Sequence, residues 1–159
     1  MMMLASEVIS RLQGKTLVTA ESCTGGAIGA ALTAVSGASA VYKGGIISYC
    51  NEVKNSMLGV SDALLNEVGA VSAPVAEAMA NGARRALKAD IAVSVTGLAG
   101  PTGDDYGNPV GTVHIGYADE TTCVSRQFCF SGDRDAIRKA AVNEALGLIL
   151  DMCNEKSAV

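Results

Sequence analysis

Ser22 is the residue in this 159-residue sequence whose type and setting most directly suggest nucleophilic chemistry. It follows a β-branched run at residues 16–20 and precedes small, helix-compatible residues at 27–32, so we expect it at a tight strand-to-helix turn. Free backbone N–H groups and the helix dipole at such a turn favour the negative charge that develops when a serine attacks a carbonyl. Taken alone, however, a serine in this position is more often a helix N-cap than a nucleophile.

Lys54 is the candidate base for this serine. The chain has one histidine, His114, and it lies within a predicted strand, so a serine–histidine–aspartate triad lacks a well-placed base. A lysine can replace the histidine where burial or a nearby cation lowers its pKa enough to leave part of it neutral. Lys54 also fits a structural role on an exposed helix face, and Tyr49, five residues earlier, fits one in the core.

Cys23 is a rival nucleophile, because a thiol beside a helix N-terminus can have a lowered pKa. It could equally be a small buried hydrophobic residue. The five cysteines form no C-x-x-C pair and have no histidines at metal-ligand spacing. We therefore expect reduced thiols and no metal site.

Helices and strands alternate along the chain until a late hairpin. The expected helices cover residues 4–12, 27–32, 51–58, 62–68, 72–88 and 133–153, and the expected strands cover residues 16–20, 46–49, 91–96, 110–117 and 121–130. This order predicts an α/β fold, a three-layer α/β/α sandwich with a mixed, mainly parallel sheet of about five strands. No linker or composition shift divides it, so residues 1–159 are expected to form one domain.

Polar or glycine-rich segments follow three of the predicted strands, at residues 22–26, 49–54 and 96–100. Ligands in open α/β sheets bind at the carboxyl ends of the strands. We therefore expect these three segments to converge on one crevice.

The composition disfavours several classes of partner. The chain has 12 Lys and Arg against 16 Asp and Glu, a net charge of −4, and only 4% aromatic residues, so nucleic acid and anionic membranes are unlikely partners by charge and by stacking capacity. Neither a signal peptide nor an apolar run of about 20 residues is evident, and the cytoplasm is the expected compartment. A small anionic ligand held by local groups remains compatible with this charge.

Several strings of residues along the chain resemble the CinA C-terminal domain family. They are TAESCTGG at 19–26, Y-x-NE-x-K at 49–54, GAVS at 69–72, TG-x-AGP at 96–101, PVGTV at 109–113 and FSGDR at 130–134. The resemblance extends from about residue 4 to residue 153. It implies a three-layer α/β/α domain, sometimes a homodimer, that hydrolyses the carboxamide of nicotinamide mononucleotide to nicotinate mononucleotide and ammonia in bacterial pyridine-nucleotide recycling, without a cofactor.

The resemblance also implies roles for individual residues. It assigns Ser22, Tyr49 and Lys54 to catalysis, and either Lys54 or Tyr49 could relay the proton of Ser22. The candidate substrate-binding residues are Cys23, Thr24, Gly25, Gly26, Thr96, Gly97, Gly100 and Arg134. Backbone donors at 24–26 and the guanidinium of Arg134 would hold the phosphate. Without the resemblance, the sequence predicts that Arg134 forms a surface ion pair and that residues 96–100 form a turn at the end of a strand.

Two other classes of function fit parts of the sequence. A non-catalytic module that binds a pyridine nucleotide would keep the crevice but would not need a nucleophile with a base, and the absence of ammonia release would reveal it. A nucleic-acid adaptor with a similar fold is disfavoured by the net charge.

Overall fold

Five strands form one mixed sheet in the order β2-β1-β3-β4-β5 in this computed structural model, which describes residues 1–158. The strands are β1 (Leu17–Glu21), β2 (Tyr42–Ile47), β3 (Ile91–Gly97), β4 (Thr112–Ala118) and β5 (Cys123–Cys129). β1 pairs in parallel with both β2 and β3, whereas β4 runs antiparallel to β3 and β5. Four of the five strands therefore run in one direction, and the predicted mixed sheet is confirmed.

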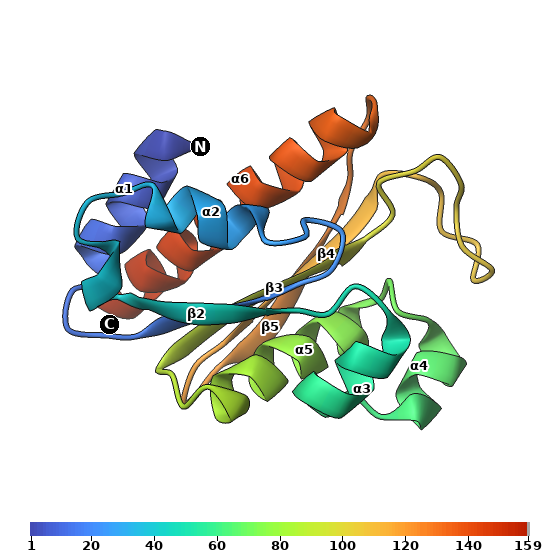
Figure 1. Ribbon diagram of the computed structural model, residues 1–159, viewed down its shortest axis with the longest axis horizontal. Helices are drawn as coiled ribbons and strands as arrows, with labels where there is room; N and C mark the ends of the chain where they lie inside the picture. Colours follow the sequence, from blue (N-terminus) through green and yellow to red (C-terminus); the bar gives the residue numbers. More distant parts are fainter. Residues whose placement is uncertain (159) are drawn as a thin grey trace.

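Helices cover both faces of this sheet (Figure 1). One layer contains α1 (Met2–Arg11), α2 (Ala27–Thr33) and α6 (Arg134–Ser157), and the other contains α3 (Asn51–Leu58), α4 (Asp62–Val68) and α5 (Ala73–Ala86). A short 3₁₀ helix, η1 (Ala38–Ala40), connects the first layer to β2. The predicted three-layer sandwich is confirmed.

The burial of each strand follows from its place in the sheet. Every residue of β1 and β4 is buried, and so are the first six residues of β3, because helices pack on both of their faces. The edge strand β2 alternates between half-buried and exposed residues. Apolar side chains consequently form two cores, one on each side of the sheet.

β2 differs from the strand expected at residues 46–49, since it begins at Tyr42 and ends at Ile47. The expected strand leaves out the pair Gly44-Gly45, but both residues lie within β2. A Cβ on Gly45 would come within 2.1 Å of Thr19 Oγ1, so the glycine is required for close packing against β1. Residues 48–50 therefore belong to the connection between β2 and α3.

One edge of the sheet collects the segments that carry the predicted chemistry. The carboxyl ends of β1, β2 and β3 lie there, together with the start of α6 (Figure 1). Two backbone hydrogen bonds continue the sheet pairing past the strands, from Ser22 N–H to Val95 O and from Ser48 N–H to Glu21 O. This pairing holds Ser22 and Ser48 side by side at the same edge.

Within residues 1–158, no helix combines the length and the apolar character needed to cross a bilayer.

Candidate active site

Ser22 and Lys54 form a buried polar pair at this edge. The Nζ of Lys54 lies 2.9 Å from the Oγ of Ser22 and donates a second hydrogen bond, of 2.6 Å, to the backbone oxygen of Ser48. Ser22 is 8% exposed and Lys54 only 1%. The lysine is carried on α3, which packs against α5 on the opposite face of the sheet from α2.

Burial controls the protonation of Lys54. Desolvation lowers the pKa of its ammonium group from 10.5 to about 8, and the nearby Cys50 and Cys23 oppose this only in part. A fraction of Lys54 is therefore neutral near neutral pH. Because Ser48 O accepts one of its N–H bonds, a neutral amine can direct its lone pair at the hydroxyl of Ser22, as a general base must.

Six of the eight backbone N–H groups between Ser22 and Gly29 have an acceptor in another residue, and Ser22 donates to Val95 O. The carboxylate of Glu21, itself 1% exposed, accepts the N–H groups of Gly26, Ile28 and Gly29. The N–H groups of Gly25 and Ala27 donate to backbone oxygens within the same turn. In the described part of the chain, those of Cys23 and Thr24 donate to no acceptor in another residue. Thr24 is fully buried, whereas Cys23 borders the cavity beside Ser22, so the Cys23 N–H is the candidate donor to a substrate.

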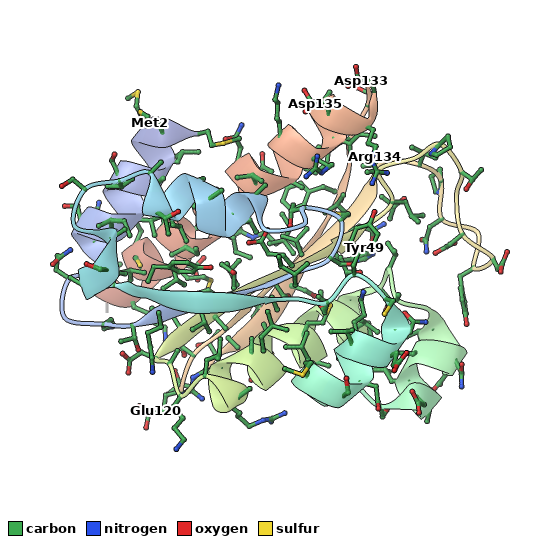
Figure 2. All side chains as sticks on the ribbon, viewed as in Figure 1. Met2, Tyr49, Glu120, Asp133, Arg134 and Asp135 are labelled. Atoms are coloured by element: carbon green, nitrogen blue, oxygen red, sulfur yellow. The ribbon has the colours of Figure 1, made fainter. Side chains whose placement is uncertain are left out.

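A cavity of about 230 Å³ opens beside Ser22. It is lined by Ser22, Cys23, Tyr49, Gly97, Leu98, Ala99, Gly100, Thr102 and Arg134. At its exposed side, the guanidinium of Arg134 donates one 2.8 Å hydrogen bond to the hydroxyl of Tyr49 and another to the backbone oxygen of Gly100. Figure 2 shows Tyr49 and Arg134 reaching this place from different elements, the β2–α3 connection and the start of α6.

The structure thus brings together six of the predicted site residues around the cavity and connects Lys54 to it through Ser22. It does not bring Thr96 there, because this residue is 1% exposed and its hydroxyl donates to Ala70 O. Thr24 and the two glycines after it do not line the cavity either. A phosphate could use the N–H of Gly26 only by displacing the carboxylate of Glu21.

Two alternative reactive residues are poorly suited to chemistry in this environment. Burial raises the pKa of the Cys23 thiol to about 11, so it stays protonated although it borders the cavity. His114 is buried in β4 opposite Thr96, does not line the cavity, and its pKa is lowered by desolvation.

Three groups with evident roles at the site were not assigned them from the sequence: Glu21, the backbone oxygen of Ser48, and Arg138. Arg138 donates to the backbone oxygens of Cys23 and Thr24 at 3.0 and 3.1 Å. Its position four residues after Arg134 on a helix was the available signal, because residues at that spacing share a helix face. Nothing in the sequence pattern pointed to a carbonyl of Ser48.

No group of three or more His, Cys, Asp or Glu side chains within residues 1–158 is arranged to hold a metal ion. The chemistry that the residues offer is that of a serine beside a buried amine, with the unpaired backbone N–H of Cys23 next to the serine. Fold and site together define an α/β/α domain with a serine–lysine pair at the carboxyl edge of its sheet.

The chain belongs to the CinA C-terminal domain family, whose model matches residues 2–153. It is 50% identical over 136 residues to a CinA-like protein of Geobacter sulfurreducens, covering 86% of this chain and 33% of the relative. It is 46% identical over 137 residues to the nicotinamide-nucleotide amidohydrolase PncC of Escherichia coli K12, covering 86% of this chain and 83% of the relative. The chain therefore spans about a third of the length of the CinA-like relatives but most of the length of the amidohydrolase.

Solved structures agree with this assignment. A CinA superfamily protein from Klebsiella pneumoniae superposes with a TM-score of 0.94 at 33% identity, covering 97% of this chain and 98% of that one. A competence/damage inducible protein from Agrobacterium tumefaciens gives a TM-score of 0.91 at 39% identity, covering 96% and 94% of the two chains.

Proposed function

We propose that this chain hydrolyses the carboxamide of nicotinamide mononucleotide, giving nicotinate mononucleotide and ammonia in pyridine-nucleotide recycling. The observation that carries the proposal is the 2.9 Å contact between Ser22 Oγ and a buried lysine with a pKa of about 8. A protein that only binds a nucleotide gains nothing from burying an amine against a serine, because such burial costs stability. The 46% identity to a nicotinamide-nucleotide amidohydrolase supports the choice of substrate.

Acylation begins from neutral Lys54. The amine takes the proton of Ser22 as Oγ attacks the carboxamide carbon, and the carbonyl electron pair moves onto the oxygen. The protonated lysine then gives this proton to the amide nitrogen, the C–N bond breaks, and ammonia leaves. The product of this half-reaction is an ester between Ser22 and the nicotinoyl group.

Deacylation repeats the sequence with water in place of the serine. Lys54 takes a proton from water, the hydroxyl oxygen attacks the ester carbon, and Ser22 leaves with the proton returned by the lysine. In both halves the negative oxygen needs a hydrogen-bond donor, and the unpaired N–H of Cys23, which borders the cavity, lies next to the nucleophile. No cofactor is required for this chemistry.

Groups at the exposed side of the cavity bind the phosphate and ribose of the substrate. Arg134 provides a positive charge there in a chain with a net charge of −4, and a guanidinium binds a phosphate with two parallel hydrogen bonds. The backbone of Gly97 and Gly100 borders the cavity and allows a ribose to approach closely. We place the nicotinamide ring toward Ser22 and the phosphate toward Arg134.

The test is ammonia release from nicotinamide mononucleotide by the purified chain, with chromatographic identification of nicotinate mononucleotide. We expect turnover, loss of turnover in Ser22→Ala, and a trapped acyl-enzyme mass on Ser22. Nicotinamide and nicotinamide riboside serve as controls that lack the phosphate. Binding of the nucleotide without ammonia release would overturn the proposal in favour of a binding module, and full activity in Ser22→Ala would overturn the serine mechanism.

A further inference from the structure

Glu21 is a buried carboxylate directly before the nucleophile. It is 1% exposed, and both of its oxygens accept backbone N–H groups, Oε2 from Gly26 and Ile28 at 3.0 Å each and Oε1 from Gly29 at 2.9 Å. Within residues 1–158, no cationic side chain forms an ion pair with it. Because a buried carboxylate is costly without compensating hydrogen bonds, these three N–H groups hold it in place.

The pattern of contacts at Glu21 requires two acceptor oxygens. A carboxylate accepts with both of its oxygens, whereas a glutamine amide accepts with its oxygen and donates with its nitrogen. In Glu21→Gln the amide oxygen could take the place of Oε2, but the amide nitrogen would then face the N–H of Gly29. An apolar side chain of the same length would leave all three N–H groups unpaired. A glutamate is therefore the side chain that satisfies this set of donors.

The carboxylate joins the two ends of the turn that carries Ser22. Glu21 is the last residue of β1, while the three N–H groups belong to the end of the turn and to the first residues of α2. Gly29 permits this approach, because a Cβ there would lie 2.6 Å from the hydroxyl oxygen of Tyr42 and would push α2 away. Residues 22–25 are thus held between two points that the same side chain fixes.

The backbone of Glu21 also connects the nucleophile with the amine. Its oxygen accepts the N–H of Ser48 at 2.8 Å, and the oxygen of Ser48 accepts from the Nζ of Lys54 at 2.6 Å. Ser22, the next residue in the chain, lies 2.9 Å from the same Nζ. The nucleophile is therefore attached to Glu21 by a covalent bond and the anchor of the amine by a hydrogen bond, so a shift of Glu21 changes the position of both.

We propose that Glu21 is a positioning residue whose carboxylate fixes the turn after β1, so that the Oγ of Ser22 stays within hydrogen-bonding distance of the Lys54 amine. This inference rests on the proposed serine hydrolase function and adds a residue to it. Glu21 does not line the cavity beside Ser22, so it acts through the nucleophile and not on the substrate.

The expected loss lies in the chemical step. Misplacement of a reacting group by about 1 Å costs about a hundredfold in rate. Glu21→Met keeps the length of the side chain without an acceptor and should lower kcat about a hundredfold, whereas Glu21→Gln keeps part of the contacts and should lower it about tenfold. KM should change less than about twofold, because the groups at the exposed side of the cavity stay in place.

The pH dependence provides a second readout. Glu21 is not among the groups that influence the pKa of Lys54, so the midpoint of the pH–rate profile should stay near 8 in the folded variants. A general loosening of the domain would instead hydrate Lys54 and move the midpoint toward 10.5, its ordinary value.

The experiment compares Glu21→Met and Glu21→Gln with the unaltered chain, each kept well below its unfolding temperature. We measure kcat and KM for ammonia release, the pH profile, and the rate at which a fluorophosphonate labels Ser22. The labelling rate should fall in parallel with kcat, least in Glu21→Gln and most in Glu21→Met. A role in stability alone would lower the unfolding temperature but leave kcat and the labelling rate of the folded protein unchanged, and that result would overturn the inference.

Asp90→Asn is the matched control. The carboxylate of Asp90 accepts the backbone N–H of Thr16 at 2.7 Å, next to the opposite end of β1, so this variant makes the same chemical change away from the turn. Its kcat should stay within about twofold of the unaltered chain even where its unfolding temperature falls. If Glu21→Met does not fold, Glu21→Gln decides the matter. A loss of kcat accompanied by an equal rise in KM, or by a shifted pH midpoint, would contradict the positioning role.

The labelling rate separates the two proposals. If the unaltered chain releases no ammonia but its Ser22 is labelled, the proposed substrate is wrong, and the labelling rates of the Glu21 variants still decide the positioning role. If the unaltered chain turns over and the variants match it in both measurements, only the positioning role fails.

Discussion

Lys54 and Tyr49 lie five residues apart in the chain, yet they belong to two contrasting halves of the site. Lys54 is 1% exposed and contacts Ser22, whereas Tyr49 is 60% exposed and contacts the Arg134 guanidinium. The buried half has a lowered lysine pKa and a hydroxyl held at hydrogen-bonding distance. The exposed half has a cation and a phenol at the opening of the cavity.

The contrast shows that one short connection can place two nearby side chains in different environments, one buried and one exposed. β2 ends at Ile47 and α3 begins at Asn51, so the intervening residues turn Tyr49 outward while the first turn of α3 directs Lys54 beneath Ser22. A low-dielectric environment strengthens electrostatic effects on a proton transfer, and an exposed one allows a charged ligand to arrive and leave. We expect changes in the buried half to alter kcat and changes in the exposed half to alter KM.

The largest effect should come from Lys54→Met, which keeps the length of the side chain and removes the amine that we propose as the base. Activity should fall about a thousandfold or more, since serine chemistry without its base retains only the contributions of binding and the oxyanion donors. Steady-state ammonia release measures the loss. Lys139→Met is the control, because it removes an exposed lysine that pairs with Asp135. Substantial activity in Lys54→Met would mean that the buried half does not supply the base.

The pH dependence of kcat/KM should follow the neutral form of Lys54. With a pKa of about 8, neutral lysine increases as the pH rises, and kcat/KM should increase about thirtyfold between pH 6.5 and 9 before levelling. The measurement is a pH–rate profile with a phosphorylated substrate in a constant-ionic-strength buffer. A profile that is flat above pH 6.5 would remove Lys54 from the role of base.

The same pKa predicts a change in stability of defined sign. The unfolded chain holds the Lys54 proton up to its ordinary pKa of 10.5, while the folded chain releases it near 8, so folding is favoured as the pH rises through this window. The free energy of unfolding of the native chain, relative to that of Lys54→Met, should increase by roughly 1–2 kcal/mol between pH 7.5 and 9.5. Urea denaturation of both proteins at the two pH values measures it, and a constant difference would show that Lys54 is not desolvated.

Arg134→Met tests the exposed half. Removing the cation should raise KM for nicotinamide mononucleotide about tenfold and change kcat by less than about threefold, because the guanidinium lies at the opening and not at the reacting bond. The kcat/KM for nicotinamide riboside, which lacks the phosphate, should change little in the same variant. If kcat falls as strongly as in Lys54→Met, the division between the two halves is wrong.

The two halves also differ in how far the sequence could predict them. The layers of the fold were predictable because β1 and β3 are apolar runs followed by turn residues, and because the apolar residues of α5 recur at helical spacing and form its buried face. Residues 22, 49 and 54 were expected together because parallel strands place their carboxyl ends at one edge.

The details that set the chemistry were not predictable in the same way. The glycines of the turn suggested a phosphate site, but the N–H of Gly25 donates to the backbone oxygen of Ser22, and the carboxylate of Glu21 accepts that of Gly26 together with two N–H groups of α2. These contacts are visible only in the three-dimensional structure. The burial of Lys54 likewise depends on how closely α3 packs against the rest of the domain. The sequence of α3 is typical of an exposed helix and does not reveal this packing. Side chains along β3 alternate between the two faces of the sheet, and that of Thr96 lies on the face covered by α5. The sequence motif around Thr96 does not reveal which face its side chain takes.

The smallest effect is expected from Tyr49→Phe, and it decides whether the phenol takes part in proton transfer. The hydroxyl of Tyr49 accepts from Arg134 and is not within hydrogen-bonding contact of Ser22, whereas the amine of Lys54 is. Removing the hydroxyl should therefore loosen Arg134 and raise KM about threefold, the scale of one exposed hydrogen bond, while kcat stays within about twofold.

Steady-state kinetics of Tyr49→Phe beside the Arg134→Met, Tyr49→Phe double variant measures this. The KM effect of the phenol should disappear once Arg134 is gone, since the hydroxyl then has no guanidinium to orient. A fall of kcat by a hundredfold in Tyr49→Phe alone would instead assign the proton relay to Tyr49 and move it into the chemical half of the site.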